Sequence, residues 1–195
     1  MLRILFVCTG NTCRSPMAEG LLRKLAKERG LALEVRSAGV SAISGMSMSR
    51  HAAAILRDEG ITDTIQSSQL TPETVAWADL VLTLTSGHKR HLLQYFPEAV
   101  AKTHTLKEFV YNEDSVNGDI RELDSLYADA ELRLALGGEP DPADMQRIIE
   151  IRQRIPSFDI TDPFGGTRED YELTAAEIRT ALYSLLDKLE TLRHQ

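Results

Sequence analysis

Two side chains near the N-terminus have the types and the spacing of a covalent phosphate-transfer site. Cys8 and Arg14 are separated by five residues, within the segment Val-Cys-Thr-Gly-Asn-Thr-Cys-Arg-Ser-Pro at 7–16. A thiolate is a strong nucleophile, and a guanidinium can hold two oxygens of one phosphoryl group. A loop this short can place the sulfur at the base of a cradle and the guanidinium on its rim. The pair therefore predicts attack by Cys8 on phosphorus, with Arg14 binding the phosphoryl oxygens.

A strand and a helix must flank this loop. Residues 4–7 are Ile-Leu-Phe-Val, a run typical of a strand that is buried on both faces of a parallel sheet. After Ser15 and Pro16, apolar residues recur at helical spacing as far as Gly30, and Ser15 is the predicted N-cap. Because amides at a helix N-terminus bind anions, we expect the following residues to surround the phosphoryl group: Thr9, Gly10, Asn11, Thr12, Cys13, Arg14 and Ser15. A buried, unreactive Cys8 is the alternative, which these flanking elements disfavour.

The segment 7–16 resembles the signature loop of the low-molecular-weight protein tyrosine phosphatase family. The form with Thr12, followed by Met-Ala-Glu at 17–19, most resembles the bacterial protein-arginine phosphatases. The resemblance covers most of residues 1–111 and resumes at about 159–193. It implies a doubly wound α/β fold and a general acid on an Asp-Pro-aromatic loop.

The segment Asp-Pro-Phe-Gly-Gly at 162–166 fits such an acid loop. Pro163 biases Asp162 toward an extended conformation, so we expect its carboxylate to project over the cradle and protonate the leaving atom. An isolated Asp-Pro pair is more often a simple turn, and the matching loop at Cys8 reverses that preference. Cys8, Arg14 and Asp162 are thus the predicted catalytic set, acting through a phosphocysteine.

Two hydrogen bonds are predicted to support the cradle. The Ser15 hydroxyl can bond the Cys8 sulfur and help it leave, or it can serve only as a helix cap. Ser37 lies in a Ser-Ala-Gly turn that, in the family, lies beside the phosphate loop. It can therefore bond Asn11, or it can belong to a turn with no further role.

Thr12 and Phe164 are the positions predicted to set the substrate. The resemblance implies a bulkier aliphatic residue at position 12 in tyrosine-specific relatives, whereas the small polar Thr12 complements a guanidinium nitrogen. Phe164 can line one wall, but Gly165 follows it where such relatives often carry a second aromatic residue. A weaker aromatic clamp favours phosphoarginine, and phosphotyrosine is the alternative substrate.

Composition limits the partners. The net charge of −7 argues against nucleic acid and anionic membrane surfaces, and no apolar run approaches a membrane span. The two cysteines, Cys8 and Cys13, lie in one loop, which fits a reducing cytoplasm and predicts no metal site and no cofactor. On oxidation they are predicted to form a reversible disulfide, with a packing role for Cys13 as the alternative. The expected partners are phosphorylated proteins, with inorganic phosphate as a product.

The chain of 195 residues is predicted to be one α/β phosphatase domain, a doubly wound parallel sheet of about four strands with helices on both faces. Strands are expected at 4–7, 33–39, 79–84 and 103–106, and further helices at 51–59, from 72, from 86 and from 168. On the helix from 86, the basic residues 88–91 are predicted to form a solvated face. Residues 112–158 are expected to be an inserted helical hairpin. Asp119 is predicted to cap the first helix, which ends at Gly137-Gly138, and Asp141-Pro142 to start the second, which Pro156 stops.

Two other classes of protein are compatible with the cradle. An arsenate reductase has the same fold, but such enzymes relay oxidation to further cysteines, and this chain has none beyond Cys8 and Cys13. A non-catalytic phosphate-binding module would tolerate loss of the nucleophile or of the acid. Cys8, Arg14 and Asp162 are all present, which favours the enzyme.

Overall fold

The structure is a computed structural model that describes residues 1–111, 114–155 and 157–193. It divides into two compact units, Met1–Val110 with Phe158–Gln195, and Tyr111–Ser157. Within the described residues, no helix combines the length and the hydropathy needed to cross a membrane.

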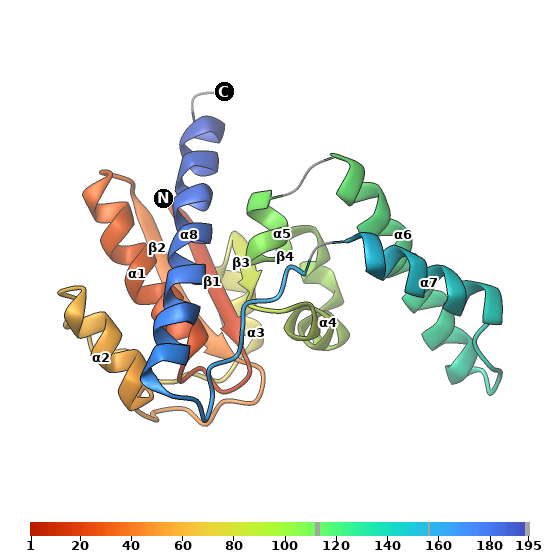
Figure 1. The fold of residues 1–195 in the computed structure, drawn as a ribbon, viewed down its shortest axis with the longest axis horizontal. Coiled ribbons are helices and arrows are strands. Elements are labelled where there is room, and N and C mark those ends of the chain that lie inside the picture. Colours follow the sequence, from red (N-terminus) through yellow and green to blue (C-terminus); the bar gives the residue numbers. More distant parts are fainter. Residues whose placement is uncertain (112–113, 156, 194–195) are drawn as a thin grey trace. The chain divides into compact units, whose positions relative to one another are not determined.

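The first unit is built on a four-stranded sheet in which every pairing is parallel (Figure 1). The strands are β1 (Leu2–Cys8), β2 (Leu33–Gly39), β3 (Leu80–Thr83) and β4 (Thr103–Thr105), in the order β2-β1-β3-β4. Cys8 pairs with Gly39, and Val7 pairs with both Ala38 and Thr83. The nucleophile thus ends the first strand, at the carboxyl edge where parallel sheets bind ligands. The predicted fold class is confirmed.

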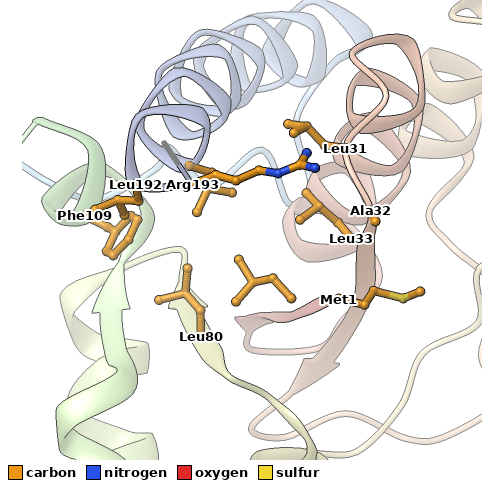
Figure 2. Close-up of a pocket in the computed structure, with 10 residues that line it drawn as sticks. Met1, Leu31, Ala32, Leu33, Leu80, Phe109, Leu192 and Arg193 are labelled. Carbon is orange, nitrogen blue, oxygen red and sulfur yellow. The ribbon is translucent and has the colours of Figure 1, made fainter. Parts of the chain in front are cut away.

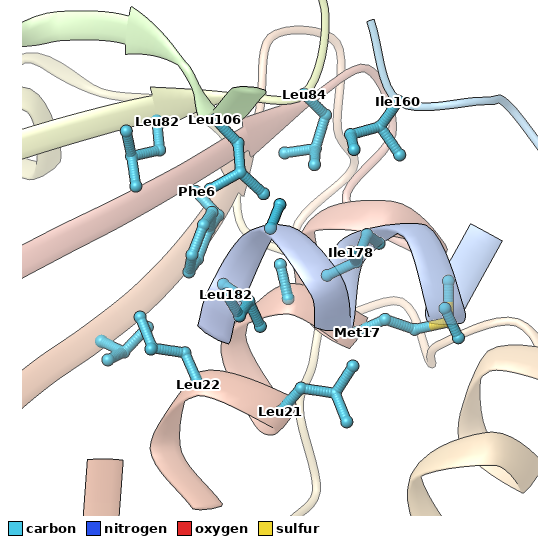
Figure 3. Close-up of a cluster of buried hydrophobic side chains, with 14 of the residues drawn as sticks. Phe6, Met17, Leu21, Leu22, Leu82, Leu84, Leu106, Ile160, Ile178 and Leu182 are labelled. Carbon is cyan, nitrogen blue, oxygen red and sulfur yellow. The ribbon is translucent and has the colours of Figure 1, made fainter. Parts of the chain in front are cut away.

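The side chains on the two faces of β1 pack into two separate apolar cores. Ile4, Phe6 and Cys8 point into a cluster shared with α1 (Arg14–Glu28) and α8 (Arg168–Arg193). Figure 3 shows Phe6 in this cluster among side chains of both helices. Burial on both faces is what the unbroken apolar run of β1 predicts.

The opposite core holds Leu5 and Val7 of β1 together with side chains of two short helices. These helices are α3 (Pro72–Trp77) and α4 (Ser86–Tyr95), followed by the 3₁₀ helix η1 (Pro97–Lys102). Thr71 and Thr85 are their N-caps, each accepting a bond from a backbone amide in the first turn. The helix α2 (Arg50–Asp58) lies near α1 and α8 on the other face.

One helix was not predicted. The strand β4 ends at Thr105, and α5 (Leu106–Tyr111) follows at once, where the sequence indicated only the end of a strand. Glu108 accepts a bond from the Thr105 amide, and Thr105 Oγ1 accepts one from the Glu108 amide, each with 3.0–3.1 Å between the atoms. This reciprocal cap turns the chain into the helix directly.

The second unit contains α6 (Asp114–Ala135) and α7 (Pro142–Arg154). Asp141 caps α7, as predicted, whereas α6 begins at Asp114, ahead of the predicted cap Asp119. Arg147 forms a two-pronged bond to Glu122, at 2.6 and 2.9 Å, which ties the helices to each other. The predicted start of the insert, residue 112, lies outside the described residues, and its description as an insert in one domain stays a prediction.

An apolar cavity of about 580 Å³ lies at the far end of the sheet from Cys8 (Figure 2). Its walls include Leu2, Leu33 and Leu80, which are the first residues of β1, β2 and β3. Among the described residues that line it, Arg193 carries the single charged side chain.

Candidate active site

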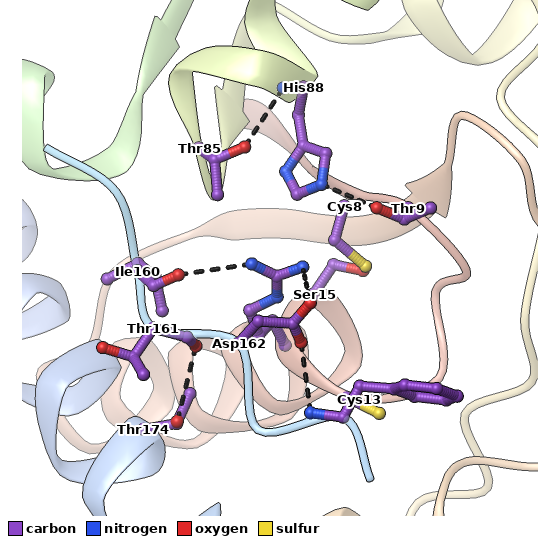
Figure 4. Close-up of polar contacts among 12 residues, drawn as sticks. Cys8, Thr9, Cys13, Ser15, Thr85, His88, Ile160, Thr161, Asp162 and Thr174 are labelled. Carbon is purple, nitrogen blue, oxygen red and sulfur yellow. Dashed lines mark hydrogen bonds and ion pairs between the residues drawn. The ribbon is translucent and has the colours of Figure 1, made fainter.

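The Cys8 sulfur lies at the base of the loop that joins β1 to α1 (Figure 4). The residue is 3% exposed. The Asn11 amide donates to Cys8 Sγ at 3.3 Å, and Ser15 Oγ lies 2.8 Å from the same sulfur. The predicted contact between Ser15 and Cys8 is confirmed.

The direction of the Ser15–Cys8 bond follows from Asn11. The Asn11 side-chain amide donates to Ser15 Oγ and to Ser37 Oγ, both at 2.8 Å, which uses its two hydrogens. Since the Ser15 oxygen accepts from Asn11, the Ser15 hydroxyl hydrogen is left for the Cys8 sulfur. The predicted bond between Ser37 and Asn11 is confirmed as well.

Ser15 is not the N-cap of α1, which corrects the prediction. The helix begins at Arg14 with Cys13 as its N-cap, and no side chain caps it. The physical reason is that the Ser15 hydroxyl is committed to Cys8 and Asn11. The helix N-terminus therefore keeps uncapped amides, the groups that bind anions.

A buried network holds Asn11 in an unusual conformation. Asn11 has a φ of 55°, in the left-handed region that asparagine tolerates better than most residues. Its Oδ1 accepts from the Ser68 amide at 2.7 Å, and Ser37 donates onward to Glu19 at 2.5 Å. Burial raises the pKa of Glu19 above its usual range, while the hydrogen bond from Ser37 and the charge of Arg23 act against that rise. Every polar group of the Asn11 side chain is thus satisfied away from the cradle mouth.

The end of β2 supports the loop from below. The Val40 amide donates to the Cys8 carbonyl at 3.0 Å, and the Ser41 amide donates to the Thr9 carbonyl at 2.9 Å. A Cβ atom on Gly39 would lie 3.0 Å from the Asn11 nitrogen and closer still to the Thr9 oxygen. Only glycine allows the loop backbone to approach β2 this closely.

The Arg14 guanidinium joins the cradle to the predicted acid loop. Arg14 is 6% exposed; its Nη1 donates to the Ile160 carbonyl at 3.2 Å, and its Nη2 lies 3.1 Å from Asp162 Oδ2. Ile160 is buried in the main core, and its amide donates to the Leu84 carbonyl. Asp159 accepts from the Ser86 amide at the start of α4, at 2.7 Å. The segment before Asp162 is therefore fastened to Leu84, which directly follows β3, to the start of α4 and to Arg14.

The exposed part of the acid loop carries the two predicted side chains Asp162 and Phe164. The Asp162 carboxylate pairs with Arg14 and also accepts from the Phe164 amide at 3.2 Å, a bond that tightens the turn around Pro163. The Phe164 ring is 79% exposed. Its predicted role as a wall of the substrate site stays a prediction.

The two cysteines have different neighbours. Cys13 is buried, and its sulfur lies 3.2 Å from the Tyr171 hydroxyl, whereas Cys8 faces Ser15. Burial, followed by the contact with Cys13, raises the pKa of Tyr171. Thr12 is half-buried, and its Oγ1 lies 3.7 Å from the Cys13 sulfur. Both cysteines are free thiols, and the predicted disulfide between them stays a prediction.

His88 is a residue of the site that sequence reasoning missed. The predicted solvated face of α4 is wrong at His88, which is 7% exposed and lies 2.9 Å from Thr9 Oγ1 through its Nε2. It is also wrong at Lys89, which forms an ion pair with the buried Glu108 at 3.0 Å. The helical spacing does indicate burial of His88, because the residue stands four positions before the core residue Leu92 and so lies on the same face of α4.

Within the described part of the chain, no group of three or more histidines, cysteines and carboxylates is placed to hold a metal ion. The positive groups that can face a phosphoryl anion are the Arg14 guanidinium and the amides at the start of α1. The arrangement suits nucleophilic displacement at phosphorus by a thiolate, with a carboxylate beside the guanidinium.

Comparison with known proteins gives consistent matches. The family model described as "Low molecular weight phosphotyrosine protein phosphatase" matches residues 3–132. A protein-arginine-phosphatase of Geobacillus stearothermophilus is 39% identical over 189 residues, 97% of this chain and 97% of the relative. The structure of the YwlE arginine phosphatase from that species matches with a TM-score of 0.71 at 38% identity, covering 100% of this chain and 98% of that one. A YwlE arginine phosphatase mutant with a phosphorylated active-site serine also gives a TM-score of 0.71, at 33% identity, covering 97% and 96% of the two chains.

Proposed function

This chain belongs to the low molecular weight phosphotyrosine protein phosphatase family, and we propose that its substrates are proteins phosphorylated on arginine. It is a phosphohydrolase, like its relatives. The observation that carries the proposed chemistry is the convergence of two donors, the Ser15 hydroxyl and the Asn11 amide, on one buried sulfur at the end of β1. Phosphorylation of an active-site serine in a YwlE mutant supports a phosphoenzyme intermediate.

In the proposed first step, Cys8 Sγ attacks phosphorus in line with the bond to the leaving nitrogen. The S–P bond forms as the P–N bond breaks, and Asp162 gives its proton to the leaving guanidine. Arg14 and the amides of residues 9–15 hold the three equatorial oxygens while charge moves between the attacking and leaving atoms. The ion pair between Arg14 and Asp162 supports this assignment, because it brings the proposed acid to the rim of the cradle.

In the proposed second step, water attacks the phosphocysteine and Cys8 becomes the leaving group. Asp162 takes a proton from that water, and inorganic phosphate is released. The Ser15 hydroxyl stabilises the departing sulfur, because its hydrogen is directed to Cys8 by the bond that its oxygen accepts from Asn11. A site that bound phosphate without turning it over would not need this donor.

The choice of phosphoarginine rests on Thr12 and on the relatives. Thr12 stands beside Cys13 on the cradle with a half-buried side chain, so its hydroxyl is available to a guanidinium nitrogen. The carboxylate of Asp162 matches a leaving guanidinium in charge and in geometry. The similar protein from Geobacillus stearothermophilus is described as a protein-arginine-phosphatase, and the match covers almost the entire length of both chains.

Three finer assignments complete the proposal. The residues 1–195 act as one phosphatase domain that carries the segment 112–158 as an insert. The protein works in the cytoplasm, where a reducing environment keeps its two thiols free. Under oxidation, Cys8 and Cys13 form a reversible disulfide that protects the nucleophile.

A panel of substrates tests the proposed function. The purified protein is incubated with one carrier protein phosphorylated on arginine, with the same carrier phosphorylated on tyrosine, and with arsenate plus thiols. We expect phosphate release from phosphoarginine at a kcat/KM at least tenfold above that for phosphotyrosine, and no arsenate reduction. A preference for phosphotyrosine would replace the proposed substrate, and binding without release would refute the enzyme mechanism.

A further inference from the structure

The histidine on α4 that contacts the cradle has one satisfied and one unsatisfied nitrogen. His88 Nε2 lies 2.9 Å from Thr9 Oγ1. His88 Nδ1 is buried and has no hydrogen-bond partner, and among the described residues it is the one buried side-chain polar atom in that state. The ring is 7% exposed, so solvent does not replace the missing partner. Such an atom requires an explanation.

The surroundings of the ring keep it neutral. Burial and then the charge of Arg14 lower the pKa of His88 to about 4, and His91 acts in the same direction. Asp159 and Asp162 act in the opposite direction without cancelling the effect. At neutral pH the imidazole therefore carries one proton, and the question is which nitrogen holds it.

The unpaired Nδ1 decides between the two tautomers. A proton on Nδ1 would be a buried donor with no acceptor, and Nε2 would then accept from the Thr9 hydroxyl. A proton on Nε2 leaves only a lone pair on Nδ1 and gives Nε2 a partner in Thr9 Oγ1. Since buried N–H groups without an acceptor are much rarer than acceptors without a donor, the second form is favoured.

We propose that His88 is a positioning residue of the phosphate cradle, which donates from Nε2 to Thr9 Oγ1 and so frees the Thr9 hydroxyl hydrogen for a phosphoryl oxygen. Thr9 directly follows the nucleophile, and its side chain is exposed on the cradle. Its carbonyl accepts from the Ser41 amide, so the residue is held from the backbone and from the side chain. This inference rests on the proposed role of the cradle in binding the substrate phosphoryl group.

Variants of His88 show whether the residue acts as a hydrogen-bond donor or only fills space. The amide nitrogen of glutamine can occupy the place of Nε2, whereas that of asparagine occupies the place of Nδ1. We expect His88→Ala and His88→Asn to lower kcat/KM for an aryl phosphate, and to raise the Kd for inorganic phosphate, by about three- to tenfold, the loss of one hydrogen bond. His88→Gln should stay within about twofold of the wild type. His91→Ala, on the same helix, is the matched control and should change neither quantity.

A double-mutant cycle shows whether His88 acts through Thr9. If it does, His88→Ala should have no further effect on phosphate affinity in a Thr9→Val background. Losses that multiply in the double mutant, or a His88→Gln protein as impaired as His88→Ala, would overturn the inference.

The wild-type protein provides a test that does not depend on folding of a variant. Nitrogen-15 NMR of the imidazole at neutral pH should show the hydrogen on Nε2 of His88, and a hydrogen on Nδ1 would overturn the inference. The aryl phosphate, the phosphate Kd and the tautomer are all measured without phosphoarginine. Failure of the phosphoarginine assay would therefore refute the proposed substrate alone.

Discussion

At Gly39 the end of β2 lies so close to the phosphate loop that a single methyl group there should disable the cradle. In Gly39→Ala, the new Cβ would lie 2.8 Å from the Ala42 Cβ, 3.0 Å from the Asn11 nitrogen and closer to the Thr9 carbonyl oxygen than either. Ordinary contact begins at 3.4 Å, so the Thr9 carbonyl and β2 must separate by about 1 Å. Neither side can yield easily, because the atoms belong to the backbone and Cys8 pairs with Gly39 in the sheet.

The size of the expected effect follows from that displacement. Overpacking of this kind costs about 1–3 kcal/mol in the free energy of unfolding, which a domain with an ordinary stability of about 5–15 kcal/mol survives. A shift of about 1 Å in groups that position the reacting atoms costs on the order of 100-fold in rate. We therefore expect a folded protein whose kcat/KM for an aryl phosphate is reduced about 100-fold.

The assay compares two glycine-to-alanine variants by urea unfolding and by steady-state kinetics. Gly118 of α6 is the control, since a Cβ there meets no atom within 4 Å, and Gly118→Ala should keep full activity and gain up to about 1 kcal/mol from helix propensity. The reasoning would be refuted by a Gly39→Ala protein that is folded and retains kcat/KM within about twofold of the wild type. Such a result would mean that the cradle adjusts to the methyl group without losing its geometry.

Four further outcomes are expected. Cys8→Ser should abolish turnover with the far-UV circular dichroism unchanged, and steady phosphate release by this variant would exclude the covalent route. Asp162→Asn should lower kcat by about 10²–10⁴-fold. Mild peroxide should inactivate the protein reversibly, with a peptide linking Cys8 to Cys13 in a non-reducing map; no recovery with thiols, or no such peptide, would contradict this. Thr12→Ile should lower kcat/KM for phosphoarginine by about 5- to 100-fold, the loss of a polar contact, and leave phosphotyrosine hydrolysis equal or faster; an unchanged ratio would move specificity elsewhere. Finally, burial and a neighbouring guanidinium hold the pKa of His88 at about 4 rather than 6.5, so the unfolded chain binds this proton first as the pH falls. The free energy of unfolding should then drop by up to about 3 kcal/mol between pH 6.5 and 4 and level off below, and His88→Gln should lack that part of the slope.

The parts of the site that lie close together along the chain were predictable from the sequence. The strand β1, the loop and α1 are contiguous, and an apolar run followed by Ser-Pro specifies them locally. The bonds from Ser15 to Cys8 and from Asn11 to Ser37 followed from residue type and from the placement of the second strand. One local prediction is wrong even here: the Ser15 hydroxyl bonds Cys8 and Asn11 and does not cap α1.

The parts that escaped prediction depend on contacts between distant segments. His88 and Thr9 are 79 positions apart, and nothing near either residue indicates the other. The polar composition of residues 88–91 indicates a solvated face, whereas the structure buries His88 and pairs the half-buried Lys89 with Glu108. The helix α5 was missed for a similar reason, since its start depends on a cap formed by Glu108 after a strand of only three residues.

The position of Asp162 is in the end a consequence of core packing. Ile160, two residues earlier, is 1% exposed, gives its amide hydrogen to Leu84 and offers its carbonyl to Arg14. Figure 3 shows Ile160 beside Leu84 at one end of the cluster that fills the space under the sheet. The same residue thus anchors the loop in the core and accepts from the guanidinium, which ties the segment before Asp162 to Arg14. The Asp-Pro sequence sets only the local turn, and it is the burial of Ile160 that brings that turn to the cradle across 146 positions of the chain.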